Sequence, residues 1–215
     1  MEAWMAEKKE QDTREKIHTA ARREFLEKGF QSASLRNIVK LAGVTTGAFY
    51  GYYKSKEELF EALTGEQAEY VLQLFDTTLD RFDRLAGEEQ TRQMTDISGD
   101  AMCQLLDYIY DHSEAFKLLI LCAEGTKYAD FIHQLVVKET TSTFAYIETL
   151  RQMGVPVKPV NQKLIHMVSS GLFTGIFETV VHDMPKGEAT EYLMQLRSFW
   201  TAGWEQLLGV KFGEK

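Results

Sequence analysis

The sequence predicts an all-α protein. All three prolines, Pro156, Pro159 and Pro185, lie in the last third of the 215 residues, so no proline interrupts a helix before residue 155. Apolar residues recur at the three- and four-residue spacing of amphipathic helices, and no stretch alternates like a half-buried strand. A hydrophobic content of 44% fits a compact globular chain with one large domain, or a small domain and a larger one.

The first predicted elements are two helices separated by a short loop. Helical spacing of apolar residues predicts a helix over residues 13–28, which Gly29 ends. After the loop "QSAS", Ser34 is placed to cap a short helix over residues 35–42, and Gly43 ends it.

A helix-turn-helix follows from the next signals. Thr45 can cap a second short helix that runs to about Tyr53, and Ser55 with Glu58 has the capping-box spacing that begins a helix to about residue 84. Helices this short need tertiary packing, which we expect through Phe25, Ile38, Val44 and Phe49. An ordinary helical hairpin in a bundle is the alternative interpretation.

The rest of the chain is also predicted to be helical. The expected helices cover residues 90–112, 114–123, 127–153, 160–183 and 188–208. Between them lie the loops "AGEE", "HS", "EGTK", "GVPVKP" and "MPKGE". No internal repeat or low-complexity segment is evident.

Charge is distributed unevenly along the chain. The formal net charge is −8, but residues 1–60 carry 11 Lys and Arg against 9 Asp and Glu, while the remainder carries 13 against 23. Residues 28–56 contain five cationic side chains and no acidic one. This segment is therefore where an anionic partner would bind.

These motifs resemble the tetracycline-repressor (TetR/AcrR) family of bacterial transcriptional regulators. The resemblance covers roughly residues 13–63 and rests on "AARREFLEKGF" and "SLRNIVKLAGVTTGAFYGYYKSKEELF". Two departures are Asn37, where Asp is more usual, and Tyr52, where His is more usual. Beyond about residue 65 only length and helical organisation are similar.

The resemblance implies about nine helices, three of them in a DNA-binding head. We expect this helix-turn-helix domain over residues 11–65, and a ligand-binding and dimerisation domain over residues 66–215. The implied function is that of a ligand-responsive repressor, which binds a palindromic double-stranded DNA operator as a homodimer. A ligand-independent or activator-type regulator of the same fold and a helical enzyme are the alternatives.

The helix-turn-helix interpretation assigns candidate DNA contacts. The second helix enters the major groove by its N-terminus, where Thr45, Thr46 and Gly47 lie. Arg36 is the candidate base reader, because Arg pairs with guanine in the commonest specific contact. Three further residues are expected to contact the DNA backbone, namely Tyr50, Tyr52 and Lys56, with Ser34 and Lys40 as weaker candidates. Phe49 and Tyr53 are expected on the core side.

Residues in the larger part are candidates for an effector site. The candidates are apolar or are polar residues within apolar helices: Phe75, Met102, Phe116, Phe131, His133, Phe144, His166, Ser170 and Phe173. Each of them is also explained by an ordinary place in the core. The sequence does not identify the effector.

The predicted helix over residues 160–183 indicates a dimer interface. It is apolar nearly all round, which is typical of a helix that is buried on every side. Gly171 and Gly175 share a face on which another backbone can approach closely, and the last helix offers Phe199, Trp200, Gly203 and Trp204. Close packing within one subunit is the alternative explanation of the glycines.

Other classes of protein find little support. The glycines of the basic segment do not form a phosphate-binding loop, and the five histidines form no HxxxH pair, so neither an enzyme nor a metal or cofactor site is expected. The charged N-terminus lacks the apolar run of a signal peptide. Only two cysteines, Cys103 and Cys122, fit a reduced cytoplasmic protein, with a redox-sensing pair as the alternative.

Overall fold

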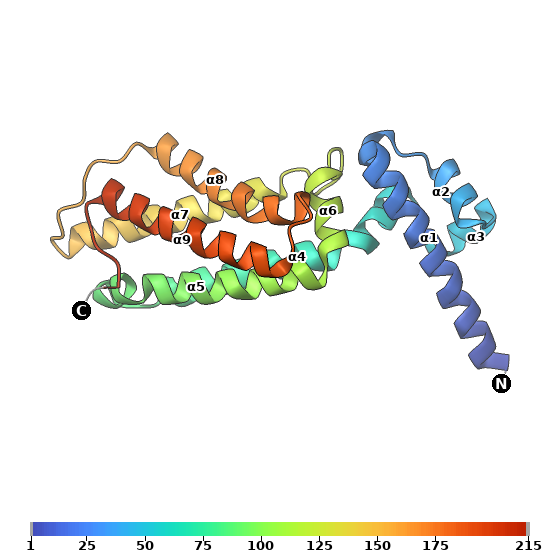
Figure 1. The fold of residues 1–215 in the computed structure, drawn as a ribbon, viewed down its shortest axis with the longest axis horizontal. Coiled ribbons are helices and arrows are strands. Elements are labelled where there is room, and N and C mark those ends of the chain that lie inside the picture. Colours follow the sequence, from blue (N-terminus) through green and yellow to red (C-terminus); the bar gives the residue numbers. More distant parts are fainter. Residues whose placement is uncertain (1, 214–215) are drawn as a thin grey trace. The chain divides into compact units, whose positions relative to one another are not determined.

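A computed structural model describes residues 2–213, apart from the side chains of residues 2, 3 and 6 (Figure 1). This part of the chain is helical throughout, with turns and short loops between helices and no strand. The helices are α1 (Glu2–Ser32), α2 (Leu35–Ala42), α3 (Thr46–Tyr52), α4 (Lys56–Asp83), α5 (Gly87–Asp111), α6 (Ser113–Leu121), α7 (Phe131–Gln152), α8 (Gln162–Val181) and α9 (Lys186–Leu208). The all-α prediction is confirmed.

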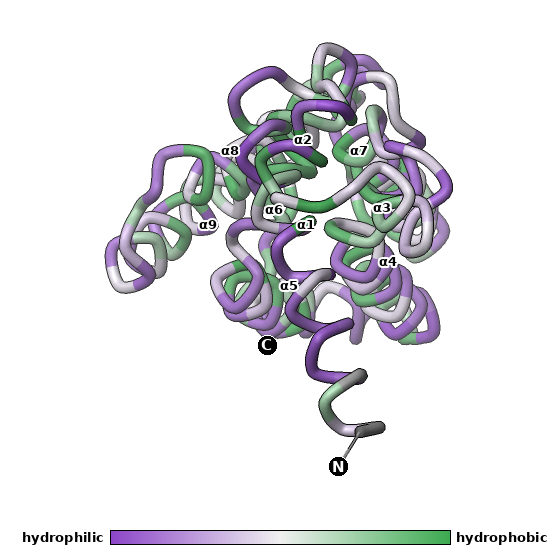
Figure 2. Tube along the Cα trace, turned by 90° about the vertical axis from the view of Figure 1, so that its right-hand side faces the viewer, coloured by the Kyte–Doolittle hydropathy of each residue, from purple (hydrophilic) through white to green (hydrophobic). Residues whose placement is uncertain are grey.

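The first helix begins earlier than expected. We predicted a start near Thr13, whereas α1 begins at Glu2. Figure 2 shows its N-terminal part as largely hydrophilic, and in Figure 1 this part extends beyond α2 and α3. A polar stretch without an apolar stripe gives no periodicity signal, which is why the sequence did not place it in the helix.

The helices form two compact units that are not contiguous in the sequence. The N-terminal unit comprises the chain up to Glu69 together with His112–Ala129, and the C-terminal unit comprises Tyr70–Asp111 and Asp130–Lys215. The helix α4 therefore contributes to both. The predicted boundary at residue 65 also lies within α4, and the division of functions between the two units remains a prediction.

Aromatic packing holds the N-terminal unit together. Phe25, Phe30 and Phe60 lie with ring centroids 5.2–5.8 Å apart. The segment that contains α6 joins this core, where the Phe30 amide donates a hydrogen bond to the Cys122 carbonyl over 3.0 Å. Of the residues expected to pack the short helices, Phe25, Ile38 and Phe49 are fully buried and Val44 is partly buried.

In the C-terminal unit α8 packs against α7 and α9. By length and composition α8 could also cross a membrane. Within this unit it buries Ile165, Phe173, Ile176 and Phe177. A cluster of buried residues around Phe82 also belongs to the core of this unit.

Candidate nucleic-acid interface and effector cavity

Local capping fixes the two short helices of the head. Ser34 Oγ accepts a hydrogen bond from the Asn37 amide over 3.4 Å at the start of α2, and Thr45 Oγ1 accepts one from the Ala48 amide over 3.1 Å at the start of α3. Between them Gly43 has φ 65°, a left-handed conformation that favours glycine. The predicted caps and glycine turn are confirmed.

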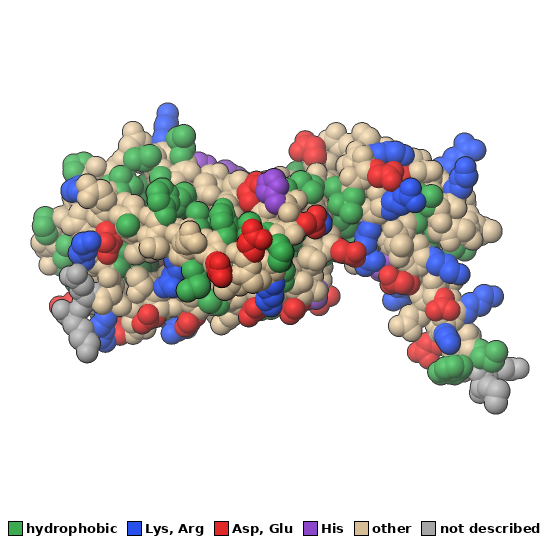
Figure 3. Space-filling view, viewed as in Figure 1, with side chains coloured by type: hydrophobic (Ala, Val, Ile, Leu, Met, Phe, Trp, Pro, Cys, Tyr) green, Lys and Arg blue, Asp and Glu red, His purple; other side chains and the backbone are tan. Residues whose placement is uncertain are grey.

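These helices present a polar and cationic surface. Arg36 and Lys40 on α2 are exposed, as are Thr45, Thr46 and Gly47 at the start of α3. A Cβ atom built on Gly47 would meet no other atom within 4 Å, so the backbone here is open to a partner. Figure 3 shows Lys and Arg side chains projecting from this unit. Their DNA contacts stay predictions.

The four aromatic rings of the segment divide between core and surface. Phe49 and Tyr53 are buried, as predicted, and the Tyr53 hydroxyl shares a short hydrogen bond with His18 Nε2. Burial first, and then the charge of Arg22, lowers the pKa of His18. Tyr50 is 54% exposed. Tyr52 differs, because its hydroxyl donates to the Glu10 carbonyl of α1 over 3.3 Å.

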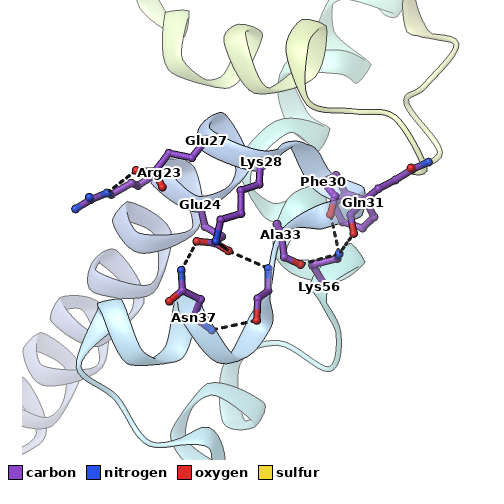
Figure 4. Close-up of polar contacts among 10 residues, drawn as sticks. Arg23, Glu24, Glu27, Lys28, Phe30, Gln31, Ala33, Asn37 and Lys56 are labelled. Atoms are coloured by element: carbon purple, nitrogen blue, oxygen red, sulfur yellow. Dashed lines mark hydrogen bonds and ion pairs between the residues drawn. The ribbon is translucent and has the colours of Figure 1, made fainter.

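Lys56 is engaged within the head. Its ammonium donates to three carbonyl oxygens at and just after the C-terminal end of α1: Phe30 (2.6 Å), Gln31 (3.2 Å) and Ala33 (3.0 Å) (Figure 4). It also lies 4.5 Å from the centroid of the Phe30 ring. An ammonium has three hydrogens to donate, and all are used here. The ammonium is therefore engaged within the head, and the phosphate contact of Lys56 stays a prediction.

A buried carboxylate joins α1 to α2. Glu24 is fully buried and accepts hydrogen bonds from Lys28 Nζ (2.8 Å), the Ser34 amide (3.0 Å) and Asn37 Nδ2 (Figure 4). Burial opposes ionisation, but the three donors outweigh it and lower the pKa of Glu24. No local sequence pattern marked Glu24 as buried, although it lies in the buried stripe of α1 with Ile17.

The C-terminal unit contains a partly open cavity of about 210 Å³. Residues of α4, α5, α7, α8 and α9 line it, and most of them are apolar or aromatic. Three of the predicted effector residues, Phe75, Met102 and Phe173, are in the lining. The cavity therefore forms among the helices where the sequence analysis expected an effector site.

The other predicted effector residues lie outside the lining of this cavity. Phe116 is buried in the N-terminal unit, and Phe131 packs on Phe177. The rings of His133 and His166 pair with each other at 5.5 Å. Phe144 packs against the cluster around Phe82, and Ser170 also lies outside the lining. Apolar periodicity marked these residues as interior but could not show which interior surface faces a cavity.

Two charged residues of the lining were missed by the sequence analysis. Glu139 on α7 is half-buried and lines the cavity, and its removal from water raises the pKa of its carboxyl to about 7. Arg197 on α9 donates a hydrogen bond to the Thr95 carbonyl of α5. Its guanidinium lies so close to Gly99 that a Cβ atom built there would be 2.6 Å from it.

The predicted interface glycines serve packing within the protomer. A Cβ atom on Gly171 would lie 3.3 Å from the Trp200 ring, and one on Gly175 would lie 3.1 Å from Leu196 Cδ2, both on α9 of the same chain. Trp200 and Trp204 line the cavity. Phe199, which is 66% exposed, and Gly203 remain on the surface.

The described residues show no metal-binding cluster, and the two cysteines do not form a disulfide. Within residues 2–213 no group of three or more His, Cys, Asp or Glu side chains is placed to hold a metal ion. Cys103 and Cys122 are both free, and burial raises the pKa of Cys122 to about 11. A thiol with such a pKa stays protonated and unreactive at neutral pH.

Comparison with known proteins gives consistent matches. Residues 17–63 match the family described as bacterial regulatory proteins, tetR family. The HTH-type transcriptional regulator TtgR of Pseudomonas putida is 30% identical over 145 residues, which span 67% of this chain and 60% of TtgR. The regulator SrpR of the same species is 25% identical over 193 residues, or 88% of this chain and 84% of SrpR.

Solved structures share the fold. A transcriptional regulator from Aquifex aeolicus VF5 aligns with a TM-score of 0.51 at 19% identity, over 87% of this chain and 99% of that one. The Bacillus subtilis regulator FadR, solved in complex with stearoyl-CoA, aligns with a TM-score of 0.50 at 17% identity. The alignment covers 87% of this chain and 97% of FadR. The match of residues 17–63 to the family and the similarity to TtgR show that the chain belongs to the tetR family of bacterial regulatory proteins.

Proposed function

We propose that the protein is a cytoplasmic transcriptional repressor that binds a palindromic DNA operator as a homodimer and releases it when a small molecule binds. The observation that carries this proposal is the exposed surface of α2 and α3. There Thr45, Thr46 and Gly47 form the start of the second helix, and Arg36 is exposed on the first. This is the part of a helix-turn-helix that enters the major groove.

A second copy of the chain is the proposed partner for the exposed face of α8 and α9. Leu164, Met167, Met194 and Phe199 on these helices are all more than 40% exposed. Figure 3 shows hydrophobic side chains on this face. A palindromic operator needs two heads, and covering this apolar surface by a second subunit would supply them.

Effector release would use α4, which is one continuous helix from the head into the cavity lining. It begins at Lys56, and Phe75 and Phe82 line the cavity. An effector that shifts α4 would change the DNA affinity, with a coupling free energy of about 1–3 kcal/mol. The coupling is reciprocal, so operator DNA must weaken effector binding by the same factor.

The test is selection of bound sequences from a random pool of duplex DNA by the full chain, followed by footprinting and sedimentation. We expect two inverted half-sites protected by one dimer, and a promoter carrying them should be repressed in a reporter strain. Binding without sequence preference, or one monomer on one half-site, would contradict the proposal. Activation of the reporter would contradict the repressor assignment alone.

A further inference from the structure

The cavity of the C-terminal unit contains an acidic group in an otherwise apolar setting. Its volume of about 210 Å³ exceeds the roughly 150 Å³ that admits a benzene molecule. The lining therefore has room for one ring and a short chain. Within it Glu139 is the acidic side chain, and no hydrogen bond or ion pair to its carboxylate is found among residues 2–213.

Several other polar groups of the lining have partners, although the buried Trp200 Nε1–H has none among residues 2–213. Arg197 donates to the Thr95 carbonyl, and the Tyr146 hydroxyl shares a 2.8 Å hydrogen bond with Thr91 Oγ1. Ser142 Oγ donates to Asp83 over 3.3 Å. The carboxylate of Glu139 is thus left as an acceptor for a molecule that enters the cavity.

A ligand's charge can be inferred from this arrangement. A carboxylate that is withdrawn from water and has no partner is costly when ionised, and a bound cation removes much of that cost. The aromatic faces of Phe75, Trp200 and Trp204 in the same lining also attract cations. An anionic ligand would meet repulsion from the Glu139 carboxylate.

We propose that the cavity binds an apolar organic molecule carrying a protonated amine, and that the ammonium group pairs with the Glu139 carboxylate. This inference rests on the effector site proposed above and names its chemical class. Binding is coupled to a proton, because Glu139 is partly protonated near neutral pH when the cavity is empty. The other titratable groups of the lining are Tyr146 on α7 and Arg197 on α9, while the lining residues of α4, α5 and α8 include none.

Three probes of similar size separate charge from shape: 4-phenylbutylamine, 4-phenylbutan-1-ol and 4-phenylbutanoate. Calorimetry at pH 8 should show the amine binding the wild-type chain at least tenfold more tightly than the alcohol, and the butanoate binding most weakly. Glu139→Gln should weaken amine binding at least tenfold and leave alcohol binding unchanged. Glu148→Gln is the matched control, because Glu148 lies on the same helix but is exposed.

Titrations at pH 6.5 in two buffers of different ionisation enthalpy should show proton release on amine binding to the wild-type chain and none in Glu139→Gln. Near-ultraviolet circular dichroism verifies that both variants are folded. The proposal is overturned if the amine fails to bind up to its solubility limit, if Glu139→Gln binds it equally well, or if the butanoate binds best. Operator binding measured without any probe stays unaffected by these outcomes, so failure here is distinguishable from failure of the regulator assignment.

Discussion

The side-chain amide of Asn37 on α2 donates a hydrogen bond to the buried carboxylate of Glu24 on α1. This pair accounts for a departure from the pattern of the family, in which Asp is more usual at the position of Asn37. A carboxylate there would face the carboxylate of Glu24 instead of donating to it. Asn37 on α2 and Glu24 on α1 therefore depend on each other.

The first prediction concerns this pair. Asn37→Asp should lower the free energy of unfolding at pH 7 by about 1–3 kcal/mol, because Glu24 loses a donor and gains a like charge. Urea denaturation measures the change. The matched control is Asn161→Asp, since Asn161 caps α8 through its side-chain oxygen and Asp caps equally well. Equal stability of Asn37→Asp and the wild type would contradict this account.

Substitutions of Lys56 and Lys40 distinguish a lysine that stabilises the head from a lysine that contacts DNA. Lys56→Met should lower the free energy of unfolding by about 1–3 kcal/mol, because three carbonyl oxygens lose their donor. Lys40 is exposed, so Lys40→Met should leave stability unchanged. It should instead flatten the plot of log affinity against log salt by roughly one unit for each phosphate that the variant no longer neutralises. A stable Lys56→Met with a flattened slope would instead support the predicted phosphate contact of Lys56.

Base reading is predicted for Arg36. Arg36→Ala should weaken specific operator binding by about 1–3 kcal/mol and relax the preference at one base pair of each half-site. Affinities for a set of singly substituted operators measure both effects. Arg23→Ala is the control, since Arg23 is also exposed but pairs with Glu27 on α1. Retention of every base preference in Arg36→Ala would remove Arg36 from the base-reading residues.

The sequence predicted the head more fully than the cavity, for a physical reason. The caps at Ser34 and Thr45 and the turn at Gly43 involve neighbours within a few residues, so local patterns identify them. The carbonyl partners of Lys56 lie more than twenty residues away in the sequence. No local pattern therefore distinguishes a lysine that binds backbone carbonyls from an exposed one. Glu139 is one of 32 acidic residues, and only the packing of five helices places it at a cavity.

Glu139 should also affect the pH dependence of stability in the absence of any ligand. Its pKa is about 7 in the folded chain and near 4.5 when unfolded, so the native state binds more protons between these values. Stability should therefore fall as pH rises from about 4.5 to 7. Glu139→Gln removes this loss of stability. We expect the free energy of unfolding of the variant to exceed that of the wild type by about 1–3 kcal/mol at pH 8 and to equal it at pH 4. Urea denaturation at both pH values measures the difference, and a pH-independent difference would contradict the assignment.

The last prediction concerns the proposed dimer. Because Gly175 packs on Leu196 of the same protomer, Gly175→Leu would disturb a single subunit and cannot report on an interface. Phe199→Glu is the sharper test, since Phe199 is 66% exposed on α9 and a charge there meets water in a monomer. It should yield monomers with unchanged helical circular dichroism.

Operator affinity of Phe199→Glu should fall by roughly 10²–10⁴-fold, because two linked heads bind far more tightly than one. Val137→Glu, on the exposed side of α7, controls for charge alone and should remain dimeric. A Phe199→Glu chain that still sediments as a dimer would place the interface elsewhere.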